Sequence, residues 1–180
     1  SSSAEREEWI HALCEVKPAN ISLHGRTLKQ LYQGVADWET IGRAAEIVHK
    51  HGLHILGNGD IANLSDAKEK VEKYGVDGVL IGRAAEGNPG IFLSESIASK
   101  PSEARDKKQR LAWAVEHAYV YEQVFKPSNA TDDDIRWFLP MRKHLAWYAH
   151  GFPGAVELRM SLMRTKNADE VRGLVEKSLG

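Results

Sequence analysis

Along the first 99 residues, apolar positions alternate between helical spacing and short continuous runs. Helical spacing predicts three helices, over residues 4–17, 37–52 and 63–75. Each is followed by a short, almost continuously apolar run, which predicts three strands, over residues 19–27, 53–61 and 76–85. Asn63 or Ser65 is expected to cap the start of the third helix, and Gly75 to end it. This alternation is typical of a parallel sheet covered by helices.

From residue 100 onward the pattern is helical throughout, after a polar linker that contains Pro101. Apolar spacing predicts four helices, over residues 107–125, 131–151, 155–165 and 167–179. Thr131 is expected to cap the second of these, and Pro140 to kink or break it. Asn167 and Glu170 have the spacing of a reciprocal capping pair at the start of the last helix. These elements predict a small all-α bundle.

Composition adds few constraints. The 180 residues carry a formal net charge of -1, and no apolar run is long enough to cross a bilayer. Residues 1–99 hold 10 Lys and Arg against 14 Asp and Glu, whereas residues 100–180 hold 14 against 11. A mildly basic second half suits a polyanion, but ordinary surface variation explains it as well.

The single cysteine, Cys14, lies in an apolar helical stripe and is interpreted as a buried thiol in a cytoplasmic protein.

Polar residues follow each predicted strand at the point where the strand ends. The three loops are His24-Gly25-Arg26-Thr27, Asn58-Gly59-Asp60 and Gly82-Arg83. The carboxyl ends of parallel strands share one edge of a sheet, and glycines there let a ligand approach the backbone. Together with the helix start in "AEGNPGIF", the last two loops predict an anion cradle that suits a phosphate. Taken singly, Asn-Gly is also a common turn, and His24 also suits a structural histidine.

These segments resemble a known family. "LHGRT", "GNGDI" and "IGRAAEGNPGIF" are similar to the last three strand ends of the tRNA-dihydrouridine synthases. "RKHLAWYAHGFPGAVELR" resembles the core of their C-terminal helical domain. The resemblance implies an α/β fold: the C-terminal portion of a (β/α)8 TIM barrel, with three parallel β/α units, followed by an all-α helical bundle. Residues 1–99 would be the FMN-phosphate-binding part and residues 100–180 the tRNA-binding domain.

The resemblance implies an FMN-dependent oxidoreductase that reduces uridine to 5,6-dihydrouridine in tRNA, with NADPH as the reductant. Arg26 receives no role. The cofactor-binding residues that the resemblance implies are His24 near the flavin ring, Asn58, Gly59 and Asp60 along FMN, and Gly82 and Arg83 at its phosphate. The implied tRNA-binding residues are Arg136, Arg142, Lys143 and Arg159. Each of these four suits a solvated helix face equally well.

The sequence departs from the family in one large respect. A barrel of this kind needs eight strands and about 250 residues. The family's catalytic cysteine belongs to a motif in the earlier half of the barrel, and Cys14 does not correspond to it. We therefore expect no catalytic residue and no metal site in this chain, which alone would be inactive. It is expected to be a fragment, or to be completed by the missing half of the barrel or by a second copy. The alternatives are another phosphate-binding barrel and a non-catalytic RNA-binding or assembly module.

Overall fold

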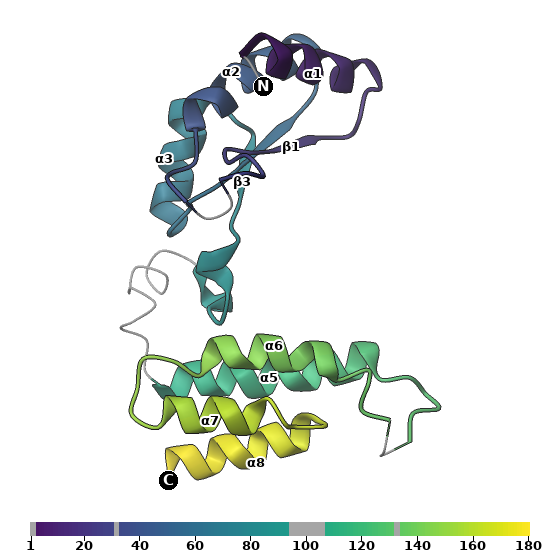
Figure 1. Ribbon diagram of the computed structural model, residues 1–180, viewed down its shortest axis with the longest axis vertical. Helices are drawn as coiled ribbons and strands as arrows, with labels where there is room; N and C mark the ends of the chain where they lie inside the picture. The colour runs from purple at the N-terminus through teal and green to yellow at the C-terminus, as the bar shows by residue number, and fades with distance from the viewer. Residues whose placement is uncertain (1–2, 31–32, 94–106, 132–133) are drawn as a thin grey trace. The chain divides into compact units, whose positions relative to one another are not determined.

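The chain forms two compact units. The structure is a computed structural model that describes residues 3–30, 33–93, 107–131 and 134–180 (Figure 1). The first unit ends at Ala84, and Ala85–Leu93 belong with the helices of the second unit. The expected boundary at residues 99 and 100 lies outside the described residues. The assignment of residues 85–93 nevertheless differs from the expectation, because Gly87 of this segment packs directly on Trp147 in the helical unit.

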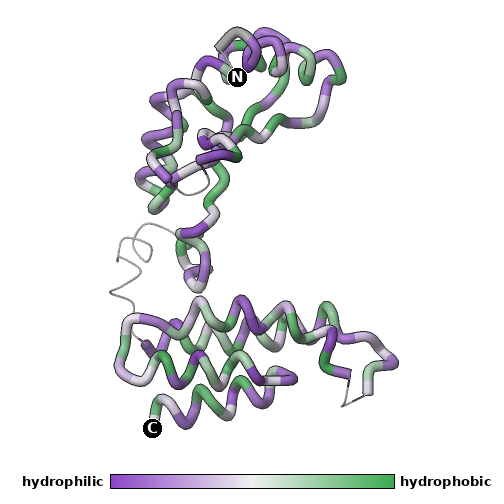
Figure 2. The backbone as a smooth tube through the Cα atoms, viewed as in Figure 1, coloured by the Kyte–Doolittle hydropathy of each residue, from purple (hydrophilic) through white to green (hydrophobic). Residues whose placement is uncertain are grey.

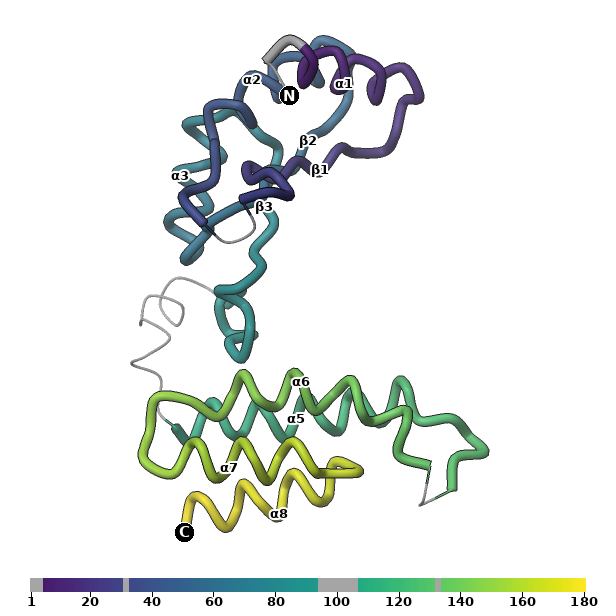
Figure 3. The backbone as a smooth tube through the Cα atoms, viewed as in Figure 1, coloured from purple at the N-terminus to yellow at the C-terminus, as the bar shows by residue number. Residues whose placement is uncertain are grey.

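A parallel three-stranded sheet organises the first unit. Its strands are β1 (Ile21–His24), β2 (Ile55–Asn58) and β3 (Gly78–Leu80), in the order β1-β2-β3 (Figures 1 and 3). The register pairs His24 with Asn58, and Asn58 with Leu80. The predicted parallel sheet is therefore confirmed, and its three strands end at the same edge.

Three helices pack beside this sheet, with α2 in contact with both of the others. They are α1 (Ser3–Glu15), α2 (Trp38–Lys50) and α3 (Leu64–Tyr74). Local chemistry fixes their ends. The Asp37 side chain accepts from the Thr40 N–H at the start of α2. The Asn63 side chain accepts from the Asp66 N–H at the start of α3. Gly75 ends α3 in the left-handed conformation, as the sequence predicted.

The core of the first unit lies between the helices and the sheet. Ile41 and Val48 of α2 are fully buried with Ile55 of β2. Cys14 is 1% exposed and belongs to the same cluster, which confirms its interpretation as a buried thiol. Burial also raises the pKa of this thiol. Cys14 therefore contributes to packing.

The second unit is helical in its described residues. It contains the 3-10 helix η2 (Pro89–Phe92) and the α-helices α5 (Lys107–Phe125), α6 (Leu139–Tyr148), α7 (Ala155–Leu162) and α8 (Ala168–Leu179). Hydrophobic and hydrophilic positions alternate along these helices (Figure 2). Leu111, Leu145, Leu162 and Val171, one from each α-helix, are fully buried in one cluster. No described helix is long and apolar enough to cross a membrane.

The start of α6 differs from the prediction. The helix begins at Leu139, and the described residues just before it, 134–138, form no α-helix. Pro140 therefore lies in the first turn, where a missing N–H costs nothing, and it produces no kink. Asp134 pairs with Arg136 through its carboxylate, and only its backbone N–H bonds to Thr131. The expected cap at Thr131 is wrong for this reason.

The start of α8 agrees with the prediction in part. The Asn167 side chain caps the helix by accepting from the Glu170 N–H at 2.9 Å. The Glu170 carboxylate accepts from the N–H of Lys166, one residue before the expected partner. The capping pair is therefore present, but it is not fully reciprocal.

Candidate functional site

The three strand ends of the first unit surround one cavity of about 400 Å3. All six residues predicted to bind a cofactor line it: His24, Asn58, Gly59, Asp60, Gly82 and Arg83. His24 and Asn58 end adjacent strands, and Gly82 follows β3 by two residues. Arg26, which received no role from the sequence, lines the same cavity. The parallel sheet thus brings together residues that lie up to about 60 positions apart.

The turn after β2 packs against Ala36 and Trp38, which lie just before and at the start of α2. Gly59 has a φ of +134°, and a Cβ there would come within 2.5 Å of the Ala36 side chain. Asp60 follows with a φ of 55°, a left-handed conformation that is unusual for a residue other than glycine. The buried indole of Trp38 donates to the Gly59 carbonyl at 2.9 Å. Strained backbone held in this way is common at binding sites.

Asp60 connects two arginines at the mouth of the cavity. Its Oδ1 accepts from Arg26 Nη1 at 2.6 Å and from Arg83 Nη2 at 2.7 Å. Its Oδ2 accepts from the Ala36 N–H at 2.8 Å. The Arg26 hydrogen bond, assisted by the other two partners, holds the pKa of the Asp60 carboxyl below its usual value against the effect of partial burial. Asp60 is therefore ionised at neutral pH and fixes both guanidinium groups.

The two arginines have different exposures. The Arg26 side chain is only 6% exposed, and its Nη2 also donates to the Gly34 carbonyl at 2.7 Å. The Arg83 side chain is 55% exposed. Arg26 therefore positions Asp60, whereas Arg83 presents its charge to solvent at the cavity. An arginine in a strand-end loop is a signal in the sequence that Arg26 could take part in the site. The sequence did not show that Asp60 is its partner.

His24 is oriented by its own loop. Its Nδ1 accepts from the Arg26 N–H at 2.9 Å, so a neutral ring carries its hydrogen on Nε2. This bond agrees with the structural interpretation of His24. The side chain is exposed at the cavity as well, so the ring is fixed in the place where a ligand would meet it.

The cavity has the charge and the openness that an anion requires. Two guanidinium groups meet one carboxylate here, so cationic donors line the cavity. A Cβ at Gly82 would meet nothing within 4 Å, so the backbone there faces open space. Within the described residues, no group of three or more His, Cys, Asp and Glu could hold a metal ion. The arrangement suits the binding of a phosphate group.

The predicted tRNA-binding residues lie in four different settings. Arg136 is exposed and paired with Asp134 at 2.9 Å. Arg142 donates to the carbonyl oxygens of Thr165 at 2.8 Å and Arg164 at 3.3 Å, so it supports the turn after α7. Lys143 and Arg159 are exposed. The structure therefore gives Arg142 a structural contact, and the binding role of all four residues stays a prediction.

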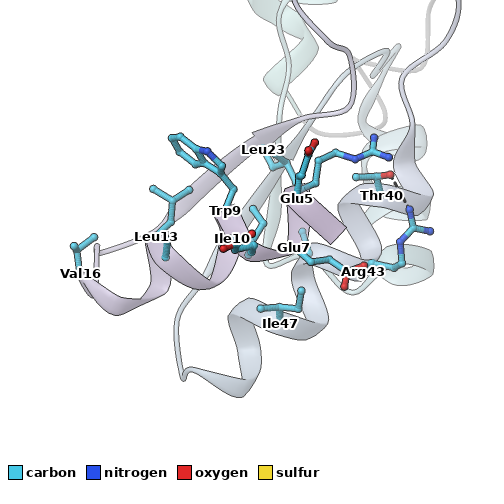
Figure 4. A pocket seen from close by; sticks show the side chains of 14 residues that line it. Glu5, Glu7, Trp9, Ile10, Leu13, Val16, Leu23, Thr40, Arg43 and Ile47 are labelled. Carbon is cyan, nitrogen blue, oxygen red and sulfur yellow. Dashed lines mark hydrogen bonds between the residues drawn. The ribbon is translucent and has the colours of Figure 1, made fainter. Parts of the chain in front are cut away.

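A second and larger cavity of about 1030 Å3 lies along α1 and α2 in the first unit. Its lining is mostly apolar, and the sequence analysis did not identify it. Trp9 and Leu13 lie on α1 and Val16 follows its last residue, with Ile47 of α2 nearby (Figure 4). Trp9 is 69% exposed and Val16 is 75% exposed. This groove contains no cluster of groups suited to catalysis, so we place the candidate site at the strand ends.

Comparisons with known proteins agree with this picture. The family model described as "Dihydrouridine synthase (Dus)" matches residues 2–179. A protein of Mycobacterium tuberculosis named "Probable tRNA-dihydrouridine synthase" is 35% identical over 162 residues, which cover 88% of this chain and 39% of that protein. A protein of Staphylococcus aureus with the same name is 33% identical over 175 residues, which cover 96% of this chain and 50% of that protein. The chain thus spans half or less of the length of these curated relatives.

Proposed function

The chain belongs to the dihydrouridine synthase family, and we propose that it is the C-terminal part of an FMN-dependent tRNA-dihydrouridine synthase. The whole protein would reduce uridine in tRNA to 5,6-dihydrouridine, with NADPH as the reductant. The observation that supports this function best is the single cavity lined by all six residues expected to bind FMN.

The residues of the cavity suit the phosphate of FMN. Arg83 offers an exposed guanidinium group, and the backbone at Gly82 faces open space. Asp60 would repel a phosphate directly, so we assign it the positioning of Arg26 and Arg83. When bound, the flavin supplies hydride transfer. The contribution of this chain is to bind the cofactor and to orient it.

The proton donor of the reaction is expected to come from the rest of the protein. Cys14 is 1% exposed and its pKa is raised, so it is unsuited to donate a proton to a substrate. We therefore propose that this chain supplies no catalytic residue. The missing barrel strands, from the same protein or from a partner, would complete the active site.

Phosphate recognition is tested by comparing FMN with riboflavin, which lacks the phosphate. Titrations of the 180-residue chain, and of a version extended upstream, are followed by flavin fluorescence. We expect FMN to bind more tightly than riboflavin, and Arg83→Ala to reduce this preference about 10-fold or more, because it removes charge-assisted hydrogen bonds. Arg172→Ala is the matched control, since Arg172 is 53% exposed and also paired with an aspartate.

Two results would contradict the assignment of the cavity. One is equal binding of FMN and riboflavin by the extended protein. The other is an Arg83→Ala variant with an unchanged preference for FMN. Binding of tRNA without any binding of FMN would instead favour the non-catalytic RNA-binding module.

The tRNA-binding role is tested separately in the helical unit. Lys143→Glu and Arg159→Glu change exposed residues, and Lys50→Glu in α2 is the control. Each phosphate contact that is lost lowers the slope of log affinity against log salt concentration by about one. We expect this decrease for Lys143 and Arg159 and an unchanged slope for Lys50. Unchanged slopes for all three would exclude our placement of tRNA on these residues.

A further inference from the structure

A third cavity, of about 480 Å3, lies within the second unit. Here it is called the α5–α6 pocket. Its walls carry Trp113 and His117 from α5, and His144, Trp147 and Tyr148 from α6. Residues four apart on a helix share a face, which explains why each helix presents several rings to the same space. The volume lies within the range of about 300–1,000 Å3 that is typical of small-molecule sites.

The rings of the pocket hold one another in place. The centroids of His117 and His144 are 5.3 Å apart, and those of His144 and Trp147 are 4.8 Å apart with an edge-to-face orientation. The Tyr148 hydroxyl lies 3.1 Å from Nδ1 of His117. Tyr148 is buried, so this hydrogen bond fixes the His117 ring. The pocket is therefore a preformed arrangement of flat surfaces.

The segment of residues 85–93 closes the pocket on a third side. Gly87 has a φ of 66°, and a Cβ at this position would collide with the carbonyl of Trp147. Close backbone contact of this kind requires glycine. Ile91 of η2 is 3% exposed, which anchors the same segment in the unit.

The two imidazoles and the phenol of the pocket are uncharged at neutral pH. Burial raises the pKa of Tyr148 to about 12. Burial and the neighbouring His144 lower the pKa of His117. The pKa of His144 is lowered by burial and by Lys143, against an opposite effect of Glu86. In the described residues the one hydrogen bond of His117 runs through Nδ1, so Nε2 can meet a ligand.

The surrounding charges restrict the kind of ligand. Glu116 lines the pocket and Glu86 acts on His144, so a phosphate inside would meet negative charge. Lys143 is exposed, with its Nζ 5.5 Å from the centroid of the Trp147 ring. This arrangement favours a flat, uncharged group that forms hydrogen bonds inside the pocket while its phosphates stay near the lysine.

We propose that the α5–α6 pocket binds an unpaired nucleobase of RNA by stacking on its aromatic walls and by hydrogen bonding to its imidazoles. The proposal rests on the proposed function, in which this unit contacts tRNA. It adds a base-binding site within the helical unit, separate from the flavin cavity. A nucleobase could also come from a free nucleotide, and the experiment distinguishes the two sources.

The test uses the whole 180-residue chain and a single-stranded RNA of about ten nucleotides with one 2-aminopurine. Binding is followed by polarisation, and stacking by the quenching of 2-aminopurine fluorescence. We expect quenching at saturation, and at least about fivefold weaker binding of an RNA that is abasic at this position. AMP and UMP are expected to bind much more weakly than the RNA.

Trp147→Leu is expected to abolish the quenching and to bind both RNAs equally. Trp9→Leu, which changes an exposed tryptophan of the first unit, is expected to leave both signals unchanged. His144→Ala serves as a second pocket variant, and circular dichroism shows whether each variant is folded. Intact quenching in both folded pocket variants would overturn the proposal.

The remaining outcomes separate this proposal from the proposed function. Equal affinity for the complete and the abasic RNA would overturn the pocket proposal and leave RNA binding in place. AMP bound as tightly as the RNA would assign the pocket to free nucleotides instead. If the chain and its upstream-extended version bind neither this RNA nor tRNA, both proposals fail.

Discussion

Trp38 offers a direct test of how helix α2 supports the cavity at the strand ends. Its side chain is 5% exposed, and its indole N–H donates to the Gly59 carbonyl at 2.9 Å. The ring also fills the space that a side chain at position 57 would need, since a Cβ on Gly57 would lie 2.5 Å from the nearest ring atom. Trp38→Phe removes the donor and part of the ring, while it keeps an aromatic residue in the core.

The expected cost follows from these two losses. The Gly59 carbonyl would lose its buried partner, which costs about 1–3 kcal/mol. The smaller ring leaves a cavity that adds to this cost. We expect the free energy of unfolding of the first unit to fall by about 2–4 kcal/mol in total. Because Gly59 lines the cavity, FMN affinity should fall too.

The free energy is measured by urea unfolding, followed by far-ultraviolet circular dichroism. Trp9→Phe is the matched control, since Trp9 is 69% exposed, and it should change stability by less than about 0.5 kcal/mol. The unfolding of the helical unit serves as an internal reference. A Trp38→Phe variant as stable as the Trp9→Phe variant would refute the reasoning from burial and hydrogen bonding.

Three further predictions concern single residues. The pKa of Asp77 is lowered, chiefly by its hydrogen bond with His49, so its carboxylate stabilises the fold at neutral pH. This contribution should be lost as the pH falls below about 4, and a comparison of urea midpoints for the wild type and Asp77→Asn between pH 3 and pH 7 checks it. Asn167→Ala removes the α8 cap and should cost about 1 kcal/mol in urea unfolding, whereas a cost near zero would contradict the cap. Gly87→Ala should destabilise the helical unit by about 1–3 kcal/mol through its collision with Trp147, and a thermal midpoint equal to that of the wild type would exclude this contact.

Local signals in the sequence predicted much of the first unit. Asn63 caps the start of α3 and Gly75 ends it. Both were predictable because a cap and a left-handed turn depend on neighbouring residues alone. The parallel order of the strands followed from their uniform apolar character. Because parallel strands end at the same edge of a sheet, the sequence also predicted which loops lie together. All six predicted cofactor-binding residues line one cavity at that edge.

Features that depend on tertiary contacts were not predicted. Arg26 and Asp60 lie 34 positions apart, and their pairing requires both strand ends to be in place. Pro140 was expected to kink or break a helix over residues 131–151, whereas it lies in the first turn of α6. Its place in the first turn accompanies the complete burial of Phe138, two residues earlier. The α5–α6 pocket depends on Gly87, whose packing partner Trp147 is distant in the sequence.

The edges of the sheet bear on how the proposed phosphate site would operate within a longer protein. Among the described residues, β1 and β3 are the edge strands, and each pairs with β2 alone. The groove along α1 and α2 beside β1 leaves apolar side chains such as Trp9 exposed (Figure 4). If a longer barrel continues from β1, it adds contacts to the flavin ring but leaves Arg83 and Gly82 in place. Absolute flavin affinity should therefore rise on upstream extension, whereas the preference for FMN over riboflavin should stay nearly constant. A preference that appears only in the extended protein would show that phosphate recognition belongs to the added strands and not to this chain.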